Sequence, residues 1–127
     1  MTDPLPAVLE TRALVASADA IRTYAELTGD TNPIHLDPVF AATTPMGGVI
    51  AHGTMSLSLL WESLACTVGP ERIARTTLDV RFLAPVRVGE HITVGGTQRA
   101  DTPGCFDVWA RTAAAVVIEG VARIRPA

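Results

Sequence analysis

The chain has 127 residues and a mass of 13.4 kDa, a length that fits one domain and leaves little room for a second. Hydrophobic residues make up 48% of it and charged residues 18%, which excludes an intrinsically disordered chain and supplies enough apolar side chains for a core. The net charge is −3 and the basic residues form no run, so nucleic acid is not an expected partner. We therefore expect one compact domain over residues 1–127.

The cysteines and the N-terminus carry no sign of secretion or of a membrane anchor. Cys66 and Cys105 lie far apart and belong to no CxxC pattern, so we expect each to pack in the fold without a disulfide. The N-terminus has no basic segment followed by a long apolar run, and no stretch approaches the ~20 apolar residues that a membrane helix needs. The expected location is the cytoplasm, with no membrane partner.

The first third of the chain predicts a strand, a helix and a sharp loop in that order. An apolar run within residues 9–17 is consistent with a strand. Apolar residues then recur at helical spacing over residues 18–28, after Ser17 as a candidate cap and before Gly29, which suits a left-handed helix end. The residues of 30–33 each favour turns, and Pro33 disfavours helical geometry at the residue before it.

The middle of the chain predicts one short helix and one long helix. Asp37-Pro38 is typical of a helix start with proline at the first position, and Gly47-Gly48 marks a turn. The longest helical pattern covers about residues 54–67, where Glu62 is the one charged residue. A helix that is apolar nearly all round is expected to be buried on most sides, so this segment is the predicted core helix.

Residues 76–124 predict an antiparallel meander, because apolar and polar residues alternate there and turn signals separate the runs. The expected turns lie at 88–90, at Gly95-Gly96 and at 102–104, and Ala114, Val116, Ile118, Gly120, Ala122 and Ile124 are expected to form one face of the last strand. One helix followed by strands, with one strand before it, is an α+β arrangement in which a curved antiparallel sheet wraps around a central helix, as in a hot-dog fold.

Asp30 and His35 are the polar residues with the fewest structural explanations. The bend between them could bring a carboxylate and an imidazole to one water molecule, which would provide a base for water and a proton for a carbon acid. Gly53 is expected at the start of the core helix, where backbone N–H groups are unpaired and the helix dipole favours negative charge. Without a side chain, Gly53 would also let a carbonyl oxygen approach closely. Hydration of an enoyl thioester needs these three elements.

Two motifs carry a resemblance to a known family. Leu27–Asp37 reads Leu-Thr-Gly-Asp-Thr-Asn-Pro-Ile-His-Leu-Asp, and Ile50-Ala51-His52-Gly53 follows it. Together they resemble the hydratase motif of MaoC-like (R)-specific enoyl-CoA hydratases, and Val80–Phe82 and Pro85–Glu90 are similar to the next strand and turn of that family. The resemblance covers most of the chain. Relatives also place a serine in the core helix, for which Ser58 and Ser63 are both only near matches.

The resemblance implies both an activity and a site. It implies hydration of a trans-2-enoyl thioester of coenzyme A or acyl carrier protein to an (R)-3-hydroxyacyl thioester, or the reverse dehydration, by a homodimer. No separate cofactor is implied, since coenzyme A or the carrier's phosphopantetheine is part of the substrate. Asp30 and His35 match the catalytic pair and Gly53 the backbone donor to the thioester carbonyl. The predicted substrate-binding residues are Asn32, which supports the loop, His52, Gly48 of a flap over the site, and Thr54.

Several alternatives remain open. Hot-dog folds also host thioesterases, because a fold alone does not fix a function, and a non-catalytic acyl-thioester-binding subunit of a heteromer with another hot-dog chain is the third hypothesis. His35, Asp37 and His52 together with Asp30 form a weak metal-binding pattern, and we expect no metal. Arg81, Arg87 and Arg99 are candidates for contact with an anionic cofactor tail.

Overall fold

The computed structural model describes residues 4–127, so the first three residues of the predicted domain lie outside the described residues. It contains a five-stranded antiparallel sheet with the order β1-β3-β4-β5-β2. The strands are β1 (Arg12–Val15), β2 (Thr76–Phe82), β3 (His91–Gln98), β4 (Cys105–Arg111) and β5 (Val116–Ile124). The helices are α1 (Ala18–Thr28), α2 (Pro33–Leu36), α3 (Pro38–Ala42), α4 (Gly53–Val68) and α5 (Pro70–Ile73).

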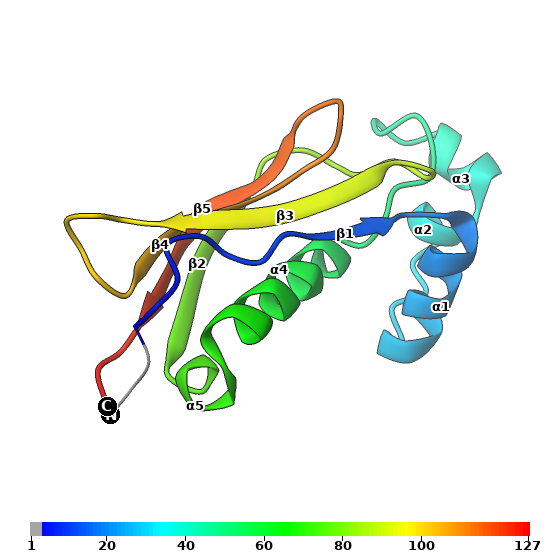
Figure 1. Cartoon of the computed structure of the whole chain (residues 1–127). Coiled ribbons are helices and arrows are strands. Elements are labelled where there is room, and N and C mark those ends of the chain that lie inside the picture. The colour runs from blue at the N-terminus through cyan, green and yellow to red at the C-terminus, as the bar shows by residue number, and fades with distance from the viewer. Residues whose placement is uncertain (1–3) are drawn as a thin grey trace.

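The sheet curves over one side of α4, and α1, α2 and α3 gather near the N-terminal end of that helix (Figure 1). The core lies between α4 and the sheet, where Leu60, Leu64, Ile92, Phe106 and Ile118 are fully buried. Burial of each such side chain is worth about 1.5–3 kcal/mol. The α+β fold with a curved antiparallel sheet around a helix is therefore as the sequence predicts.

Local signals set the ends of α1 as expected. The Ser17 side chain caps the helix by accepting a hydrogen bond from the backbone N–H of Ala20 (3.0 Å). Gly29 ends it in the left-handed region, with φ of 75°, and donates to the carbonyl of Ala25. Asp37 caps α3 and Pro38 is its first residue, which also confirms the prediction for that helix.

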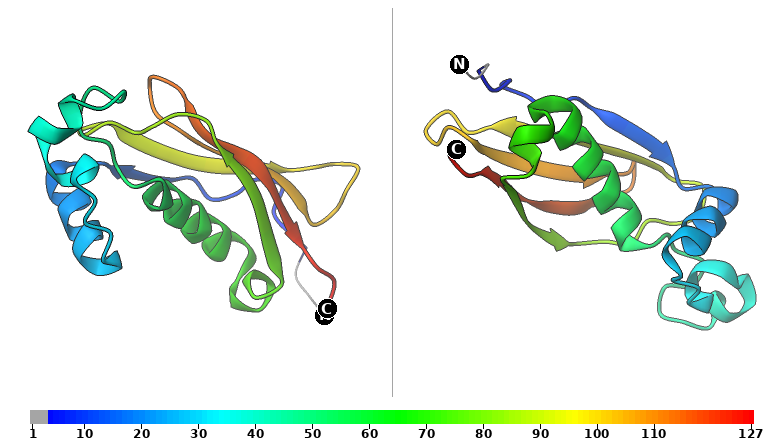
Figure 2. Two further views of the ribbon diagram at one scale, coloured as in Figure 1. Left: turned by 180° about the vertical axis from the view of Figure 1, so that it is seen from behind. Right: turned by 90° about the horizontal axis from the view of Figure 1, so that it is seen from below.

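The prediction that the core helix is buried on most sides is wrong for the single chain. One face of α4 packs on the sheet, but Thr54, Ser58, Glu62, Ala65 and Cys66 are exposed. Seen from below, α4 lies in front of the sheet with no other element over it (Figure 2). The rest of the chain thus covers only one face of this largely apolar helix.

Gly95 and Gly96 do not form the predicted turn. Both lie inside β3, where they pair with Trp109 and Val108 of β4. A Cβ atom at Gly95 would lie 2.7 Å from the Trp109 ring, and one at Gly96 would lie 2.6 Å from the carbonyl oxygen of Asp107. These glycines are strand residues that leave space for close neighbours, which is the second common meaning of glycine in a strand pattern.

Two further strand predictions need correction. The meander holds only for β3, β4 and β5, because β2 pairs with β5 at the far edge of the sheet and not with β3. In β5 the register shifts near Ala110 and Arg111 of β4, so Val117 is buried and Val116 is 41% exposed. A bulge adds a residue to one strand and reverses the faces beyond it, so Val116 does not share the predicted face and Ala114 precedes the strand.

The cysteines differ from each other. Cys105 is buried, as expected, whereas Cys66 is exposed and its Sγ accepts a hydrogen bond from Arg12 (2.9 Å). Both thiols are free. Among residues 4–127, none of the helices combines the length and the apolar character that crossing a bilayer would require.

Candidate active site

The loop after α1 brings Asp30 and His35 together, as the sequence predicts. Asp30 follows the left-handed Gly29, and its Oδ1 accepts a hydrogen bond from the backbone N–H of Asn32 (3.3 Å). His35 lies in α2, which Asn32 caps and Pro33 begins. The Nε2 atom of His35 is 3.9 Å from Oδ2 of Asp30. The pair is close enough to share one water molecule.

One hydrogen bond fixes the orientation of the His35 ring. Its Nδ1 atom lies 2.8 Å from the carbonyl oxygen of Ile50, and a carbonyl only accepts, so Nδ1 carries a proton. In the neutral ring Nε2 therefore presents a lone pair toward Asp30. The His35 side chain is 11% exposed and that of Asp30 is 53% exposed. The largely buried imidazole of His35 thus faces the solvent-exposed carboxylate of Asp30.

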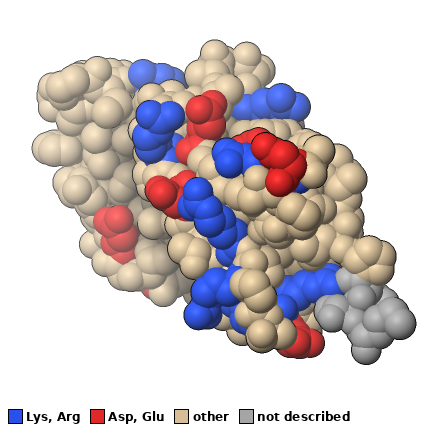
Figure 3. Space-filling view, turned by 90° about the vertical axis from the view of Figure 1, so that its left-hand side faces the viewer, with Lys and Arg blue, Asp and Glu red and all other residues tan. Residues whose placement is uncertain are grey.

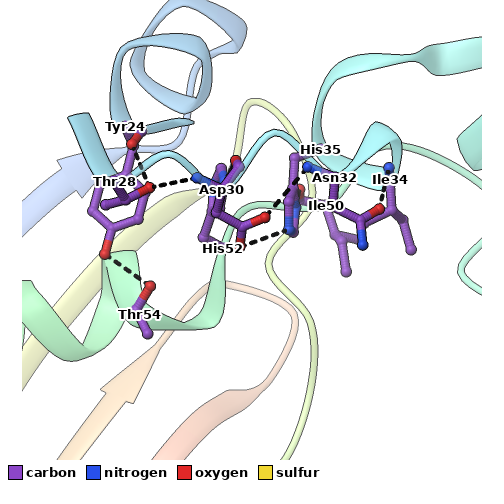
Figure 4. Close-up of polar contacts among 9 residues, drawn as sticks. All are labelled: Tyr24, Thr28, Asp30, Asn32, Ile34, His35, Ile50, His52 and Thr54. Carbon is purple, nitrogen blue, oxygen red and sulfur yellow. Dashed lines mark hydrogen bonds and ion pairs between the residues drawn. The ribbon is translucent and has the colours of Figure 1, made fainter. Parts of the chain in front are cut away.

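His52 contacts both members of the Asp30–His35 pair. It is 2% exposed, and its Nε2 donates to the backbone carbonyl of Asp30 (2.9 Å). The His52 ring stacks on that of His35, with centroids 3.8 Å apart and an angle of 25° between the rings. The Tyr24 ring also contacts the His52 ring, with centroids 5.0 Å apart and an angle of 57°. Figure 4 shows the Asp30 carboxylate facing His35, with His52 next to Asp30. His52 holds both the loop and the His35 ring in place.

Gly53 is the first residue of α4, as predicted, so its N–H has no partner within the helix. The reason for a glycine differs from the expected one. A Cβ atom at Gly53 would lie 3.1 Å from Cε1 of Phe82, so the aromatic ring occupies the space that the missing side chain leaves. Phe82 is 54% exposed. The N–H donor of Gly53 is present, with an aromatic ring beside it.

Two cavities flank the segment from Met46 to Ile50. The α4 cavity, of about 360 Å³, is bounded by Met46, residues 50–53, Ser56, residues 82–86, Val117 and Ile118. The α2 cavity, of about 400 Å³, is bounded by Ala18, Arg22, His35, Leu36, Pro38, Ala42, residues 47–49 and Val88. His52 and Gly53 therefore border one cavity and His35 borders the other, while Asp30 borders neither of these two.

The remaining predicted substrate-binding residues are not gathered in one place. The Asn32 side chain is used in the cap of α2, where Oδ1 accepts from the N–H of Ile34 (3.0 Å), which agrees with a role in supporting the loop. Gly48 borders the α2 cavity with His35. Thr54 accepts a hydrogen bond from the Tyr24 hydroxyl (2.8 Å; Figure 4). Substrate contact by these residues stays a prediction.

Three residues beside the site are absent from the sequence-based set. Tyr24 joins α1 to α4 through Thr54, and its helical spacing indicates only a core position. Phe82 lies at the end of β2, far from the motif along the chain. Ser56 lies one turn into α4, borders the α4 cavity and is 2% exposed. Of the two serines that the sequence suggested, Ser58 is exposed and Ser63 contacts Glu10, and neither borders the α4 cavity.

The site also holds a possible metal-ligand set, in Asp30, His35 and His52. One ligand atom from each lies within 4.8 Å of the others. Stacked imidazole rings at 25° direct their lone pairs nearly parallel, and one His52 nitrogen is already hydrogen-bonded to Asp30. This arrangement suits proton transfer better than the converging ligands of a metal centre. A metal-free site stays a prediction, which metal analysis of the purified protein would check.

The three candidate arginines have different surroundings. Arg81 lies 3.7 Å from Glu119, and Arg99 donates to Asp107, whose hydrogen bonds raise the pKa of Arg99. On the face shown in Figure 3, acidic side chains likewise lie among the basic ones. Arg87 donates to the carbonyl of Met46 and so adjoins the segment between the two cavities. Among these three arginines, the contact of Arg87 is thus with a residue that borders the α4 cavity.

Comparison with known proteins identifies the family. The model of the MaoC like domain matches residues 5–119. The (R)-specific enoyl-CoA hydratase of Rhodospirillum rubrum is 33% identical over 88% of this chain and 81% of its own length. The 3-hydroxybutyryl-CoA dehydratase of Methylorubrum extorquens is 39% identical over 63% of this chain, which spans only 50% of that relative. An R-hydratase from Pseudomonas aeruginosa matches the fold with a TM-score of 0.78 and 26% identity, over 96% of this chain and 81% of that one. The chain belongs to the MaoC-like domain family and has its hot-dog fold.

Proposed function

We propose that the chain is a hydro-lyase that adds water to trans-2-enoyl thioesters to give (R)-3-hydroxyacyl thioesters, and that it catalyses the reverse dehydration. The observation that carries the proposal is the Asp30–His35 pair, with Oδ2 and Nε2 3.9 Å apart beside the start of α4. Relatives named as hydratases and dehydratases support the same reaction type.

In the proposed mechanism one water molecule lies between Asp30 and His35. Its oxygen bonds to C3 while one proton passes to the pair, and the π electrons of the double bond move toward the thioester carbonyl. The Gly53 N–H stabilises the negative charge that develops on that oxygen. The pair then gives one proton to C2, so the enzyme ends in its starting protonation state. A single proton relay on one side of the substrate agrees with addition of both groups to the same face.

The acyl group is proposed to occupy the α4 cavity. His52, Gly53 and Ser56 lie at one part of its wall, and the rest is mainly aliphatic or aromatic. A carbonyl bound at Gly53 would place the neighbouring double bond near the loop that His52 ties to Asp30. A cavity of about 360 Å³ has room for a short or medium acyl chain.

The direct test is a hydration assay. Purified protein is incubated with trans-2-enoyl-CoA substrates of increasing length, and loss of the conjugated absorbance is followed. Hydration predicts loss of absorbance with the thioester intact. If the folded protein gives no absorbance change at any length, the proposal is wrong.

The same assay separates the thioesterase hypothesis. Hydrolysis releases free thiol, which a thiol reagent detects, whereas hydration releases none. The paired Asp30 and His35 favour hydration, because hydrolysis needs no proton delivered to an α-carbon. The binding-subunit hypothesis predicts ligand binding without either product.

Coenzyme A or the phosphopantetheine of a carrier protein is proposed as part of the substrate, with no separate cofactor. Arg22 borders the α2 cavity and Arg87 adjoins it, so positive charge is available for a phosphate near this end of the molecule. Matched enoyl thioesters on coenzyme A and on acyl carrier protein, compared by kcat/KM, would identify the carrier.

A homodimer is the proposed assembly. The β2 strand is an edge of the sheet, and Phe82 and Leu83 at its end are 54% and 50% exposed. Unpaired edges and apolar residues beside them are surfaces that a second copy can cover. Light scattering on the chain alone tests this, and a monomer that becomes active only with another hot-dog chain would support the heteromer instead.

A further inference from the structure

Ser56 is a buried residue whose hydroxyl is free to bind a ligand. It is 2% exposed, it borders the α4 cavity, and its hydroxyl makes no hydrogen bond to any other side chain or carbonyl among residues 4–127. Among the described residues, the fully enclosed side-chain polar atoms that lack a partner are Nδ1 of His52 and Nε of Arg12. The Ser56 oxygen is not one of them, so it faces open space. The open side of this hydroxyl is the cavity.

The position of Ser56 on α4 places it next to the Gly53 donor. The two residues are one helical turn apart, and both border the α4 cavity. Side chains of an α-helix lean toward its N-terminus and cover the preceding turn. The Ser56 hydroxyl therefore lies over the turn that begins with the free N–H of Gly53, so both donors serve the same part of the cavity.

His52 is a second polar residue at this place. It also borders the α4 cavity, it is 2% exposed, and its Nδ1 atom is buried without a partner among the described residues. Its Nε2 is engaged by the Asp30 carbonyl. One enclosed nitrogen without a partner and one cavity-facing hydroxyl therefore lie beside Gly53, and the other walls of the cavity are largely apolar. Because Nε2 carries the proton, Nδ1 of the neutral His52 ring is an acceptor and does not bind a carbonyl oxygen. The donors at this part of the cavity are the Ser56 hydroxyl and the Gly53 N–H, which suit a ligand with a hydrogen-bond acceptor at this end and an apolar group beyond it.

We propose that the Ser56 hydroxyl is a catalytic residue of the hydration reaction, as the second hydrogen-bond donor to the thioester carbonyl beside the Gly53 N–H. The inference rests on the proposed function. Negative charge on the carbonyl oxygen grows in the transition state, so a donor aimed at it acts mainly on kcat. The hydroxyl donates one hydrogen bond and forms no covalent bond with the substrate.

Steady-state kinetics provide the first test. Ser56→Ala is expected to lower kcat on the order of 10²-fold with little change in KM, whereas Ser56→Thr, which retains a hydroxyl, keeps most of the activity. Ser56→Val matches Ser56→Thr in shape without the hydroxyl and is expected to lose activity like the alanine variant. Ser63→Ala is the control, because Ser63 is a buried serine of the same helix that contacts Glu10 and not the cavity.

A spectroscopic test reports the hydrogen bond itself. A conjugated dienoyl-CoA is bound to the Asp30→Asn variant, which prevents turnover, and the absorbance maximum of the bound ligand is recorded. Hydrogen bonds to the thioester carbonyl polarise the conjugated system and shift its absorbance to longer wavelength. Adding Ser56→Val is expected to reduce this red shift, and adding Ser56→Thr is expected to preserve it.

The outcomes separate this inference from the proposed function. If the wild-type protein hydrates enoyl thioesters but Ser56→Ala and Ser56→Val keep full kcat and the full red shift, Ser56 is not a donor and the hydration proposal stands. If the wild-type protein hydrates no enoyl thioester, the proposed function is wrong, and the role of Ser56, which rests on it, is wrong as well. Loss of kcat in both variants, with a smaller red shift and rescue by Ser56→Thr, supports the second donor.

Discussion

The two ends of α4 differ in whether their polar side chains have hydrogen-bond partners within the protein. At the C-terminal end Ser63 donates to the carbonyl of Glu10, and Thr67 accepts from the Glu10 N–H (2.8 Å) while donating to the Ser63 carbonyl (2.7 Å). At the N-terminal end the Ser56 hydroxyl and one nitrogen of His52 have no partner among the described residues. Both ends belong to one helix packed on one sheet.

The difference separates structural polar groups from functional ones. The C-terminal hydrogen bonds tie α4 to the segment before β1 and leave nothing for a ligand. The N-terminal groups border a cavity and lie beside the Asp30–His35 pair. Polar groups that face a cavity are available to a ligand, whereas those already paired within the protein are not. Variants of the cavity-facing groups at the N-terminal end should therefore change catalysis, and variants of the paired groups at the C-terminal end should change stability.

The largest effect is expected at the catalytic pair. Asp30→Asn and His35→Ala should each lower kcat on the order of 10²–10⁴-fold, because each removes one member of the proton relay. The melting temperature should change little for Asp30→Asn, since that side chain is 53% exposed. Enzyme kinetics with thermal unfolding in parallel make the check. Full activity in either variant would remove that residue from the pair.

The next effect is expected at Gly53, where two variants separate the donor from the shape. Gly53→Pro removes the N–H, and both the first helical position and the backbone of His52 (φ −62°, ψ 133°) accept a proline there. It should lower kcat roughly 10²–10³-fold. Gly53→Ala keeps the N–H and needs only a small movement of the half-exposed Phe82 ring, so it should stay near wild-type activity. Equal activities of the two variants would contradict the donor role.

A smaller effect, on stability alone, is expected at the C-terminal end. Ser63→Ala leaves the Glu10 carbonyl without its donor and should lower the free energy of unfolding by about 1–3 kcal/mol. The kcat of the folded variant should equal that of the wild type. Urea unfolding measures the first quantity, with Ser58→Ala, an exposed position on the same helix, as the control. A large loss of kcat in Ser63→Ala would contradict the claim that the C-terminal end of α4 contributes to stability alone.

The smallest effect is expected where α1 meets the N-terminal end. Tyr24→Phe removes the hydrogen bond to Thr54 but keeps the ring beside His52. It should lower the free energy of unfolding by about 0.5–1.5 kcal/mol. A double-mutant cycle with Thr54→Val tests the pairing, because two additive single effects would mean that the contact contributes nothing.

What could be predicted from the sequence was mostly local. The end of α1 at Gly29, the bend before His35 and the start of α4 each depend on residues adjacent in the chain. The family motif adds the pairing of Asp30 with His35, which the structure places within reach of one water. The proximity of these two side chains is thus confirmed, and their catalytic role stays a prediction.

What the sequence missed depends on neighbours that are distant in the chain. Gly95 and Gly96 match a turn pattern, yet Trp109 of the next strand is what requires a glycine at Gly95. The place of Phe82 beside Gly53 follows from the pairing of β2 with β5, which alternation alone does not reveal. Ser56 fits an ordinary helix position until the cavity beside it is known.

The most direct test of the central claim is the reaction run in heavy water with wild-type protein and Asp30→Asn. Water addition by the Asp30–His35 pair predicts a single (R)-3-hydroxyacyl thioester with one deuterium at C2, on the same face as the new hydroxyl, and almost no product from the variant. Free acid and thiol, an unchanged enoyl thioester, or equal product from both proteins would contradict the account.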